Sequence, residues 1–185
     1  IASHRALEAY NAARAARGEV PVGMGVGISS GPLLLGTVGS EDRLRCDVVG
    51  DAVNLASRVE SLTKTYGTRM MVSGHTVDQL DEPFALRHVD RVRVQGRSEA
   101  IDLYDVLDAL PAEHRARRLD TRAWFEAAGA RLREGDVGAA LDGFRAVLDA
   151  DPTDGAAALL AGRCERFQRD GLPEGWTGTT RLSHK

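Results

Sequence analysis

The sequence predicts an α+β fold that is followed by a C-terminal α-helical hairpin region. Short apolar strands alternate with helical segments between residues 20 and 107, whereas the residues after 120 carry helical patterns alone. The chain has 185 residues, which suits one domain, or one domain with a small appendage. Its hydrophobic content of 43% is enough for a sizeable core.

Charge and composition exclude several classes of protein. The net charge is −3, so the chain offers no basic surface for nucleic acid or for an anionic membrane. Residues 20–40 carry no charge, but Pro21, Pro32 and repeated glycines exclude a membrane-spanning helix there. Cys46 and Cys164 match no metal or disulfide spacing, which favours reduced thiols and leaves a distant pair open. We expect a cytoplasmic chain that binds no nucleic acid, within a parent protein whose membrane attachment is open.

The first hundred residues contain a covering helix and several strands. Residues 2–17 are rich in alanine and have a helical face. Residues 22–28 alternate an apolar residue with a glycine, which predicts a strand. The glycine spacing fits neither a dinucleotide-binding nor a P-loop motif, so we expect a neighbouring element to approach this strand closely. Further strands are expected at residues 33–38, 69–73, 84–94 and 101–107, with a polar loop at 39–45 and a short helix at 73–80.

Residues 46–62 combine a short strand, a turn and an amphipathic helix. Residues 46–49 are a strand, Gly50 allows a sharp turn, and Asp51 is expected to cap the helix that follows. Apolar residues recur along this helix at Val53, Ala56, Val59 and Leu62, with Leu55 beside them.

Three polar residues of this unit are candidates for binding a ligand. Asn54 and Arg58 lie four residues apart, so their side chains are neighbours on one helix face. Asp47 lies at the end of the strand that leads into the helix. Each also has a structural explanation: Asp47 as a strand-end acid, Asn54 as a helix-start residue, and Arg58 as an ion-pair partner of Glu60 or Glu41.

Residues 47–58, Asp-Val-Val-Gly-Asp-Ala-Val-Asn-Leu-Ala-Ser-Arg, resemble the motif of the class III nucleotidyl cyclases, the adenylate and guanylate cyclases. The resemblance extends from about Ala6 to about Leu107. It implies part of a ferredoxin-like α/β sandwich of the nucleotide cyclase type, which converts ATP to 3′,5′-cyclic AMP and pyrophosphate in intracellular signalling. It also implies that Asp47 reads the purine, Asn54 orients the ribose, and Arg58 stabilises charge on the phosphates as pyrophosphate leaves.

The chain departs from the family pattern in two places. Ser29 and Ser30 stand where the family's hairpin has His and Thr. Gln95 stands where the family usually has a Lys that contacts the terminal phosphates. Gln95 can donate a hydrogen bond without a positive charge, and Arg97, two residues on, supplies a charge from nearby. The resemblance therefore makes Gln95 and Arg97 candidate substrate-binding residues.

The resemblance implies a homodimer whose two-metal site is shared between subunits. Two Asp residues of one subunit hold Mg²⁺ or Mn²⁺, and the other subunit supplies the residues that match Asp47, Asn54 and Arg58. No acid in this chain matches the two metal positions, which belong to a part of the domain that precedes the match. Ile1 and the lack of a signal peptide indicate a fragment of a longer protein, and we expect residues 1–185 alone to be inactive. The alternative is a catalytically silent cyclase-homology domain that binds nucleotide or protein partners.

The C-terminal third has the pattern of a tetratricopeptide repeat. The repeat's offsets are occupied by Trp124, Gly135, Ala140, Phe144 and Pro152. We expect residues 1–108 to be the cyclase part, 109–120 a linker, and 121–185 a tetratricopeptide-like helical tail. Helices are expected at residues 121–134, 137–150 and 154–169.

One repeat cannot bury its own apolar face well. The tail is therefore expected to dock on the cyclase-like part or on a second copy, and it is a possible site for a protein partner. Trp176 is expected to be a docking aromatic rather than a residue that stacks on a ligand.

Overall fold

The computed structural model describes residues 1–40, 43–94 and 99–182. Its helices are α1 (Ala2–Ala15), α2 (Asp51–Tyr66), α3 (Gly74–Val77), η1 (Leu107–Ala109), α4 (Ala112–Glu134), α5 (Val137–Ala150) and α6 (Gly155–Asp170). Its strands are β1 (Val26–Ile28), β2 (Leu34–Ser40), β3 (Arg43–Val49), β4 (Met70–Ser73), β5 (Leu86–Val94), β6 (Ala100–Val106) and β7 (Thr180–Leu182). This combination of sheet and helices confirms the α+β class that the sequence predicts.

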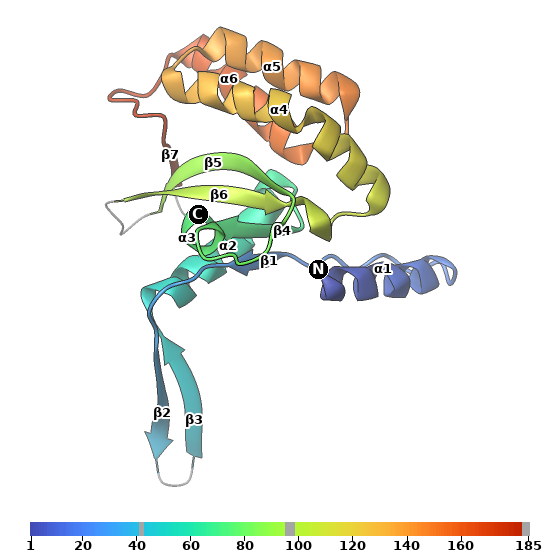
Figure 1. Cartoon of the computed structure of the whole chain (residues 1–185), viewed down its shortest axis with the longest axis vertical. Helices are drawn as coiled ribbons and strands as arrows, with labels where there is room; N and C mark the ends of the chain where they lie inside the picture. Colours follow the sequence, from blue (N-terminus) through green and yellow to red (C-terminus); the bar gives the residue numbers. More distant parts are fainter. Residues whose placement is uncertain (41–42, 95–98, 183–185) are drawn as a thin grey trace.

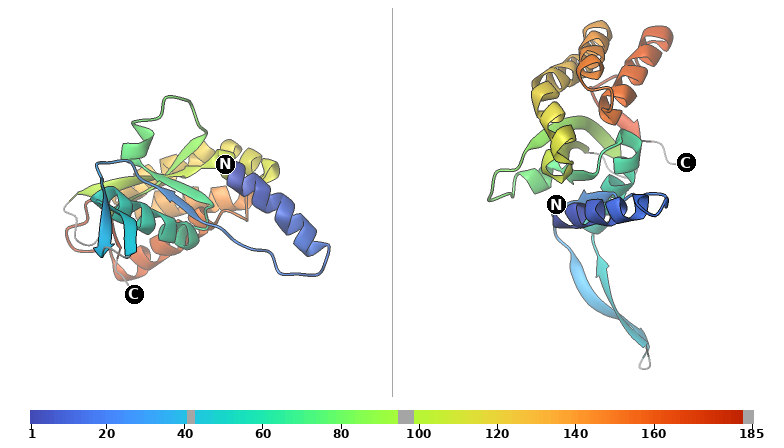
Figure 2. Two further views of the ribbon diagram at one scale, coloured as in Figure 1. Left: turned by 90° about the horizontal axis from the view of Figure 1, so that it is seen from below. Right: turned by 90° about the vertical axis from the view of Figure 1, so that its right-hand side faces the viewer.

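The strands form one five-stranded sheet and one separate hairpin. The sheet has the order β1-β4-β6-β5-β7, in which β1 is parallel to β4, β7 is parallel to β5, and β6 is antiparallel to both of its neighbours. The β2–β3 hairpin is antiparallel and extends away from the rest of the protein (Figures 1 and 2). β1 and β7 are thus the edge strands of the described sheet.

The C-terminal helices share one hydrophobic core with the sheet. Met71 of β4 belongs to a cluster that also contains Val59 of α2 and Phe125 of α4. Its neighbours Met70 and Val72 belong to a second, smaller cluster. Because alternate residues of a strand point to opposite faces, α2 and the C-terminal helices cover the same face of the sheet. The tail therefore docks on the sheet of its own chain, which is one of the two arrangements expected from the sequence.

The close approach expected at the N-terminal glycines is present in the structure. A Cβ atom added to Gly27 would lie 2.1 Å from the backbone nitrogen of Glu60, and one on Gly25 would lie 2.2 Å from Oγ1 of Thr63. Strand β1 and the loop before it therefore pack directly on α2. The strand itself is shorter than expected, because residues 22–25 precede it without strand structure.

Other expectations need correction. The buried stripe of α2 contains the expected Leu55 and Val59 but is completed by Ala52, Thr63 and Tyr66, whereas the expected Val53 is exposed. Residues 39–40 and 43–45, expected in a polar loop, belong to the strands of the hairpin. Helix α4 begins at Ala112, so the segment expected as a linker is mostly helical. Helix α5 occupies residues 137–150, as predicted.

A buried cluster of charges fastens the tail to the sheet. Arg87 of β5 donates to Asp105 of β6 and to Asp154, which caps α6. Arg118 of α4 pairs with Asp151 and Asp154. These three carboxylates and two guanidinium groups are all 5% exposed or less. The cluster carries one excess negative charge when all five groups are ionised, so a proton on one carboxylate would neutralise it.

The two remaining general expectations concern the thiols and the membrane. Cys164 is a free, buried cysteine, as predicted, and burial raises the pKa of its thiol to about 11. Within the described ranges, every helix is too short or too polar to cross a membrane.

The first prediction concerns the packing of β1 on α2. Gly27→Ala should destabilise the protein by about 3 kcal/mol, because its Cβ would overlap the α2 backbone. Gly23→Ala is the matched control, because nothing lies within 4 Å of a Cβ there, and its effect should stay within about 0.5 kcal/mol. Urea unfolding of the two variants measures the difference. Equal stabilities would refute the close approach.

The second prediction concerns the pH dependence of stability. Burial raises the pKa of Asp105 from 3.8 to about 6, although the Arg87 charge acts in the opposite direction. Between these two values the folded state binds more protons than the unfolded chain does. The contribution of Asp105 is therefore fully present below about pH 4 and is lost as the pH rises through 6, by about 3 kcal/mol at most.

Asp105→Asn removes this titration. The stability of the wild type relative to the variant should decrease between about pH 4 and pH 7, as measured by urea unfolding at both values. Parallel stability profiles would contradict the buried, proton-binding state of Asp105.

Candidate active site

The strand–turn–helix unit predicted from residues 46–62 is present as β3 and α2. Asp47 pairs with Gly36 across the hairpin, two residues before β3 ends at Val49. Helix α2 then begins at Asp51 and ends at Tyr66, where Gly67 adopts the left-handed conformation. The structure thus places the Asp47 backbone at the base of the projecting hairpin, directly ahead of the helix that carries Asn54 and Arg58.

The turn into α2 is made differently from the sequence-based expectation. Gly50 is itself the N-cap, and its φ of 171° is extended backbone that any residue adopts. The glycine is needed for space, because a Cβ there would lie 2.9 Å from the carbonyl oxygen of Pro32. Asp51 is the first residue of the helix instead of its cap, where its negative charge still complements the helix dipole.

Asn54 and Arg58 lie on the exposed side of α2. Asn54 is exposed and Arg58 is half-buried, whereas Leu55 and Val59 hold the opposite side of the helix in the core. The two polar residues are four positions apart in an unbroken helix, so their side chains share a face. This arrangement offers an amide and a guanidinium to a ligand that approaches from outside the core.

A buried hydrogen-bond network fixes the other end of α2. Tyr66 donates to Asp90 of β5 at 2.6 Å, and the same carboxylate oxygen accepts from Arg163 of α6 at 2.6 Å. Thr180 of β7 also donates to it at 3.0 Å. Burial raises the pKa of the Tyr66 hydroxyl, which therefore stays protonated and remains a donor. The helix that carries Asn54 and Arg58 is thus held by residues from both the sheet and the tail.

The loop between β1 and the hairpin is also held by hydrogen bonds. The Ser30 backbone nitrogen donates to Oγ1 of Thr76 at 2.9 Å, and Ser73 donates to Ser29 at 3.3 Å. The two serines that replace the family's His and Thr therefore anchor the base of the hairpin to α3.

Gln95 and Arg97 lie outside the described residues, between the end of β5 at Val94 and the start of β6 at Ala100. In the part of the chain that the structure describes, no group of three or more His, Cys, Asp or Glu side chains is arranged so that it could hold a metal ion. The described residues do not fit a two-metal site, and we assign no step to a metal here.

Sequence comparison identifies the family to which this unit belongs. Residues 4–107 match the family described as "Adenylate and Guanylate cyclase catalytic domain". This match covers more than half of the chain. The chain therefore belongs to the adenylate and guanylate cyclase family, as the motif at residues 47–58 indicates.

Three curated relatives are named adenylate cyclases. The terminal-differentiation specific adenylate cyclase of Dictyostelium discoideum is 33% identical over 76% of this chain and 7% of its own length. An adenylate cyclase of Anabaena cylindrica is 40% identical over 57% of this chain and 22% of its own length. Adenylate cyclase 1 of Rhizobium meliloti is 37% identical over 60% of this chain and 17% of its own length. This chain thus spans less than a quarter of each relative.

A crystal structure of the guanylyl cyclase Cya2 shares the fold. It is 31% identical to this chain, with a TM-score of 0.50, and the match covers 56% of this chain and 52% of that one. Because the chain is similar to both adenylate and guanylyl cyclases, these comparisons do not distinguish ATP from GTP as the substrate.

Sequence reasoning missed the polar residues that support α2 from within the core. Asp90 and Arg163 were passed over because each lies in an otherwise ordinary strand or helix pattern. At Asp90 the sequence does place a charged residue among the apolar positions of a strand, which indicates a buried acid that needs a partner. Its partner Arg163 lies 73 residues away in the sequence, and no local pattern connects the two.

Proposed function

We propose that this chain carries the purine-binding and transition-state-binding half of an adenylate cyclase, which converts ATP to 3′,5′-cyclic AMP and pyrophosphate. The observation that carries the proposal is the placement of Asn54 and Arg58 on one accessible face of α2, within a chain of the cyclase family. In this reaction the ribose 3′ oxygen attacks the α-phosphorus, and pyrophosphate leaves.

Arg58 is proposed to stabilise negative charge on the phosphate oxygens as the bond to pyrophosphate breaks. A guanidinium suits this role because it is planar, permanently charged and able to donate two parallel hydrogen bonds. Its position on the second turn of a helix fixed at both ends limits the reorganisation needed during the reaction.

Asn54 and Asp47 are proposed to orient the substrate. Asn54 has both a donor and an acceptor in its amide, which suits a ribose ring. Asp47 lies on the strand before the helix, from which a carboxylate can accept a hydrogen bond from the adenine amino group. Gln95 and Arg97 are proposed to contact the terminal phosphates. The carboxylates that hold Mg²⁺ or Mn²⁺ would then lie outside the described residues.

The projecting hairpin supports assembly as a homodimer. Leu34, Leu35 and Val49 are 77%, 68% and 60% exposed, and Val53 at the start of α2 is 37% exposed. Leu34 and Val49 pair across the hairpin and share one face, with Leu35 on the other, and large exposed apolar side chains of this kind indicate an interaction site. We propose that a second copy covers this surface and places its own residues beside Asn54 and Arg58. Residues 1–185 alone are expected to form no cyclic AMP from ATP and Mn²⁺.

A regulatory, catalytically silent cyclase-homology domain is the second candidate. Gln95, which replaces a positively charged residue of the family, favours it. Such a domain would bind nucleotide or protein partners without converting ATP, so turnover by the parent protein distinguishes the two candidates.

The third prediction tests Arg58. In a cyclase that contains this chain together with the rest of its catalytic domain, Arg58→Ala should lower kcat by about 100-fold to 1000-fold with little change in KM. Arg5→Ala, an exposed position on α1, is the charge-matched control and should leave kcat unchanged. Steady-state cyclic AMP formation gives both constants. Near-normal turnover of the Arg58 variant would remove this residue from the mechanism.

The fourth prediction tests Asp47 as the purine reader. Asp47→Cys removes an acceptor that adenine needs, so the ratio of kcat/KM for ATP to that for GTP should fall by at least about tenfold. Competing the two nucleotides in one assay measures the ratio directly. An unchanged ratio would assign purine selection to other residues.

The fifth prediction tests the dimer surface. Leu34→Asp should weaken self-association by at least about tenfold, because it places a charge in an apolar interface. Trp124→Ser is the control, since Trp124 is 53% exposed on α4, far along the chain from the hairpin. Sedimentation velocity over a concentration series compares the variants. Equal dissociation constants would refute the assignment of the hairpin to the interface.

A further inference from the structure

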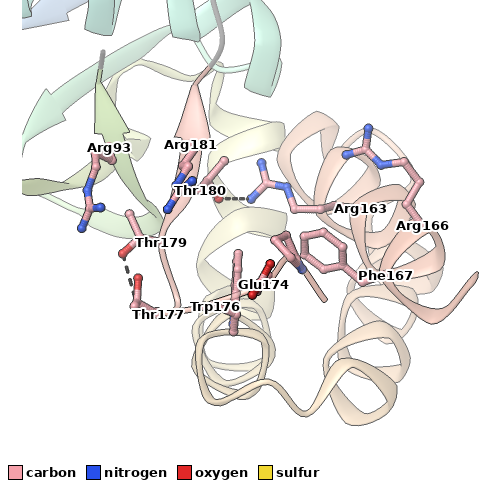
Figure 3. Close-up of a pocket in the computed structure, with 12 residues that line it drawn as sticks. Arg93, Arg163, Arg166, Phe167, Glu174, Trp176, Thr177, Thr179, Thr180 and Arg181 are labelled. Atoms are coloured by element: carbon pink, nitrogen blue, oxygen red, sulfur yellow. Dashed lines mark hydrogen bonds between the residues drawn. The ribbon is translucent and has the colours of Figure 1, made fainter. Parts of the chain in front are cut away.

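The C-terminal tail and the edge of the sheet enclose a cavity that the proposed cyclase reaction does not use. It lies between α6, the loop of residues 173–179, strand β7 and the end of β5, and its volume is about 220 Å³ (Figure 3). Only Arg93 among its lining residues belongs to the segment that matches the cyclase family.

Four arginines line this cavity, and they differ in their partners. Arg163 is buried and committed to Asp90, Tyr66 and Thr180. Arg93, Arg166 and Arg181 form no ion pair with a carboxylate in the described part of the chain.

The Nε of Arg93 is buried, and no hydrogen-bond acceptor of the described residues reaches it. A buried guanidinium nitrogen without an acceptor costs free energy unless a ligand or solvent supplies one. Glu174 is the single carboxylate among the lining residues, and it is exposed. The side chains that line the cavity therefore carry more positive than negative charge.

The remaining walls combine hydroxyl groups with apolar surface. Thr177 and Thr179 lie beside Arg93, while Phe167 and Trp176 form the opposite side in edge-to-face contact, with ring centroids 5.3 Å apart (Figure 3). Trp176 is held by the hydrogen bond from its Nε1 to the carbonyl oxygen of Leu132. Trp176 thus docks the tail, as the sequence predicts, and also gives the cavity one rigid apolar wall.

We propose that this cavity binds a compact phosphorylated anion. Arginine forks match the geometry of phosphate oxygens, and the Thr177 hydroxyl can add a donor. The volume lies below the range of about 300–1000 Å³ that holds drug-sized ligands, which favours pyrophosphate or the phosphate end of a mononucleotide. Pyrophosphate and a mononucleotide both carry phosphate groups, and the apolar wall would contact only the organic part of the mononucleotide. The inference goes beyond the cyclase proposal, because it concerns residues of the tail and needs no turnover.

Binding can be measured through Trp176. In the 185-residue chain with Trp124→Phe, Trp176 is the remaining tryptophan, and its emission should respond to ligands in the cavity. Titrations at constant ionic strength would use inorganic pyrophosphate, AMP and adenosine. Saturable binding with a Kd below about 1 mM is expected for at least one of the two anions and not for adenosine. Tighter binding of pyrophosphate assigns an inorganic ligand, whereas tighter binding of AMP assigns an organic phosphate.

Variants then locate the site. Arg166→Gln and Arg181→Gln, both at exposed positions, should each weaken binding about tenfold. Glu174→Gln should strengthen it by at least about twofold, because a repelling charge is lost. Arg5→Gln removes an equal charge from α1 and should change the Kd by less than about twofold.

Two results would overturn the proposal. One is a lack of saturable binding with a Kd below about 1 mM for both anions. The other is equal weakening by Arg5→Gln and by the cavity variants, which would reflect net charge alone. Retention of binding in an Arg58→Gln variant separates this cavity from the nucleotide face of α2, so failure of the cyclase proposal leaves the result interpretable.

Discussion

The carboxylate of Asp90 in β5 joins α2, α6 and β7 through hydrogen bonds, and the rest of the structure depends on it. One of its oxygens accepts hydrogen bonds from Tyr66 of α2, Arg163 of α6 and Thr180 of β7. A buried carboxylate is costly unless it is paired and fully hydrogen-bonded. Satisfying this one group therefore requires helix α2, the sheet and the tail to be in place together. The cluster around Arg87, near the start of β5, likewise joins the sheet to the tail.

This constraint explains how a helical tail can matter to a site that it does not touch. Asn54 and Arg58 lie in the first half of α2, whereas the tail reaches its end through Tyr66. A helix is stiff along its axis, so fixing both ends fixes the orientation of the face between them. At the start of α2 the fixed neighbour is the hairpin base, which leaves room for no side chain at Gly50. The tail is thus part of the scaffold of the cyclase domain and also encloses a cavity of its own.

The sequence predicted the helices and strands better than it predicted the contacts between them. Helix α5 and the strand–turn–helix unit follow from local periodicity, and the glycines of residues 25–27 correctly indicated close packing. The buried stripe of α2 was predicted only at Leu55 and Val59, because Thr63 and Tyr66 are buried through partners that are distant in the sequence. The linker was mistaken for the same reason, since the charged side chain of Arg118 is buried against Asp151. The shared face of Asn54 and Arg58 was predictable from spacing, whereas the arginine-lined cavity was not, because it joins residues 93 and 163–181 in space alone.

Native-state hydrogen exchange tests the central claim, that the tail holds α2 in place through Asp90. The wild type would be compared with Arg163→Met, which breaks the network, and with Arg145→Met, which breaks an exposed ion pair with Glu165. We predict that Arg163→Met lowers the protection of the amides of α2 together with those of α6, and that Arg145→Met lowers neither. Unchanged protection of α2 in the Arg163 variant, with loss confined to α6, would contradict the account.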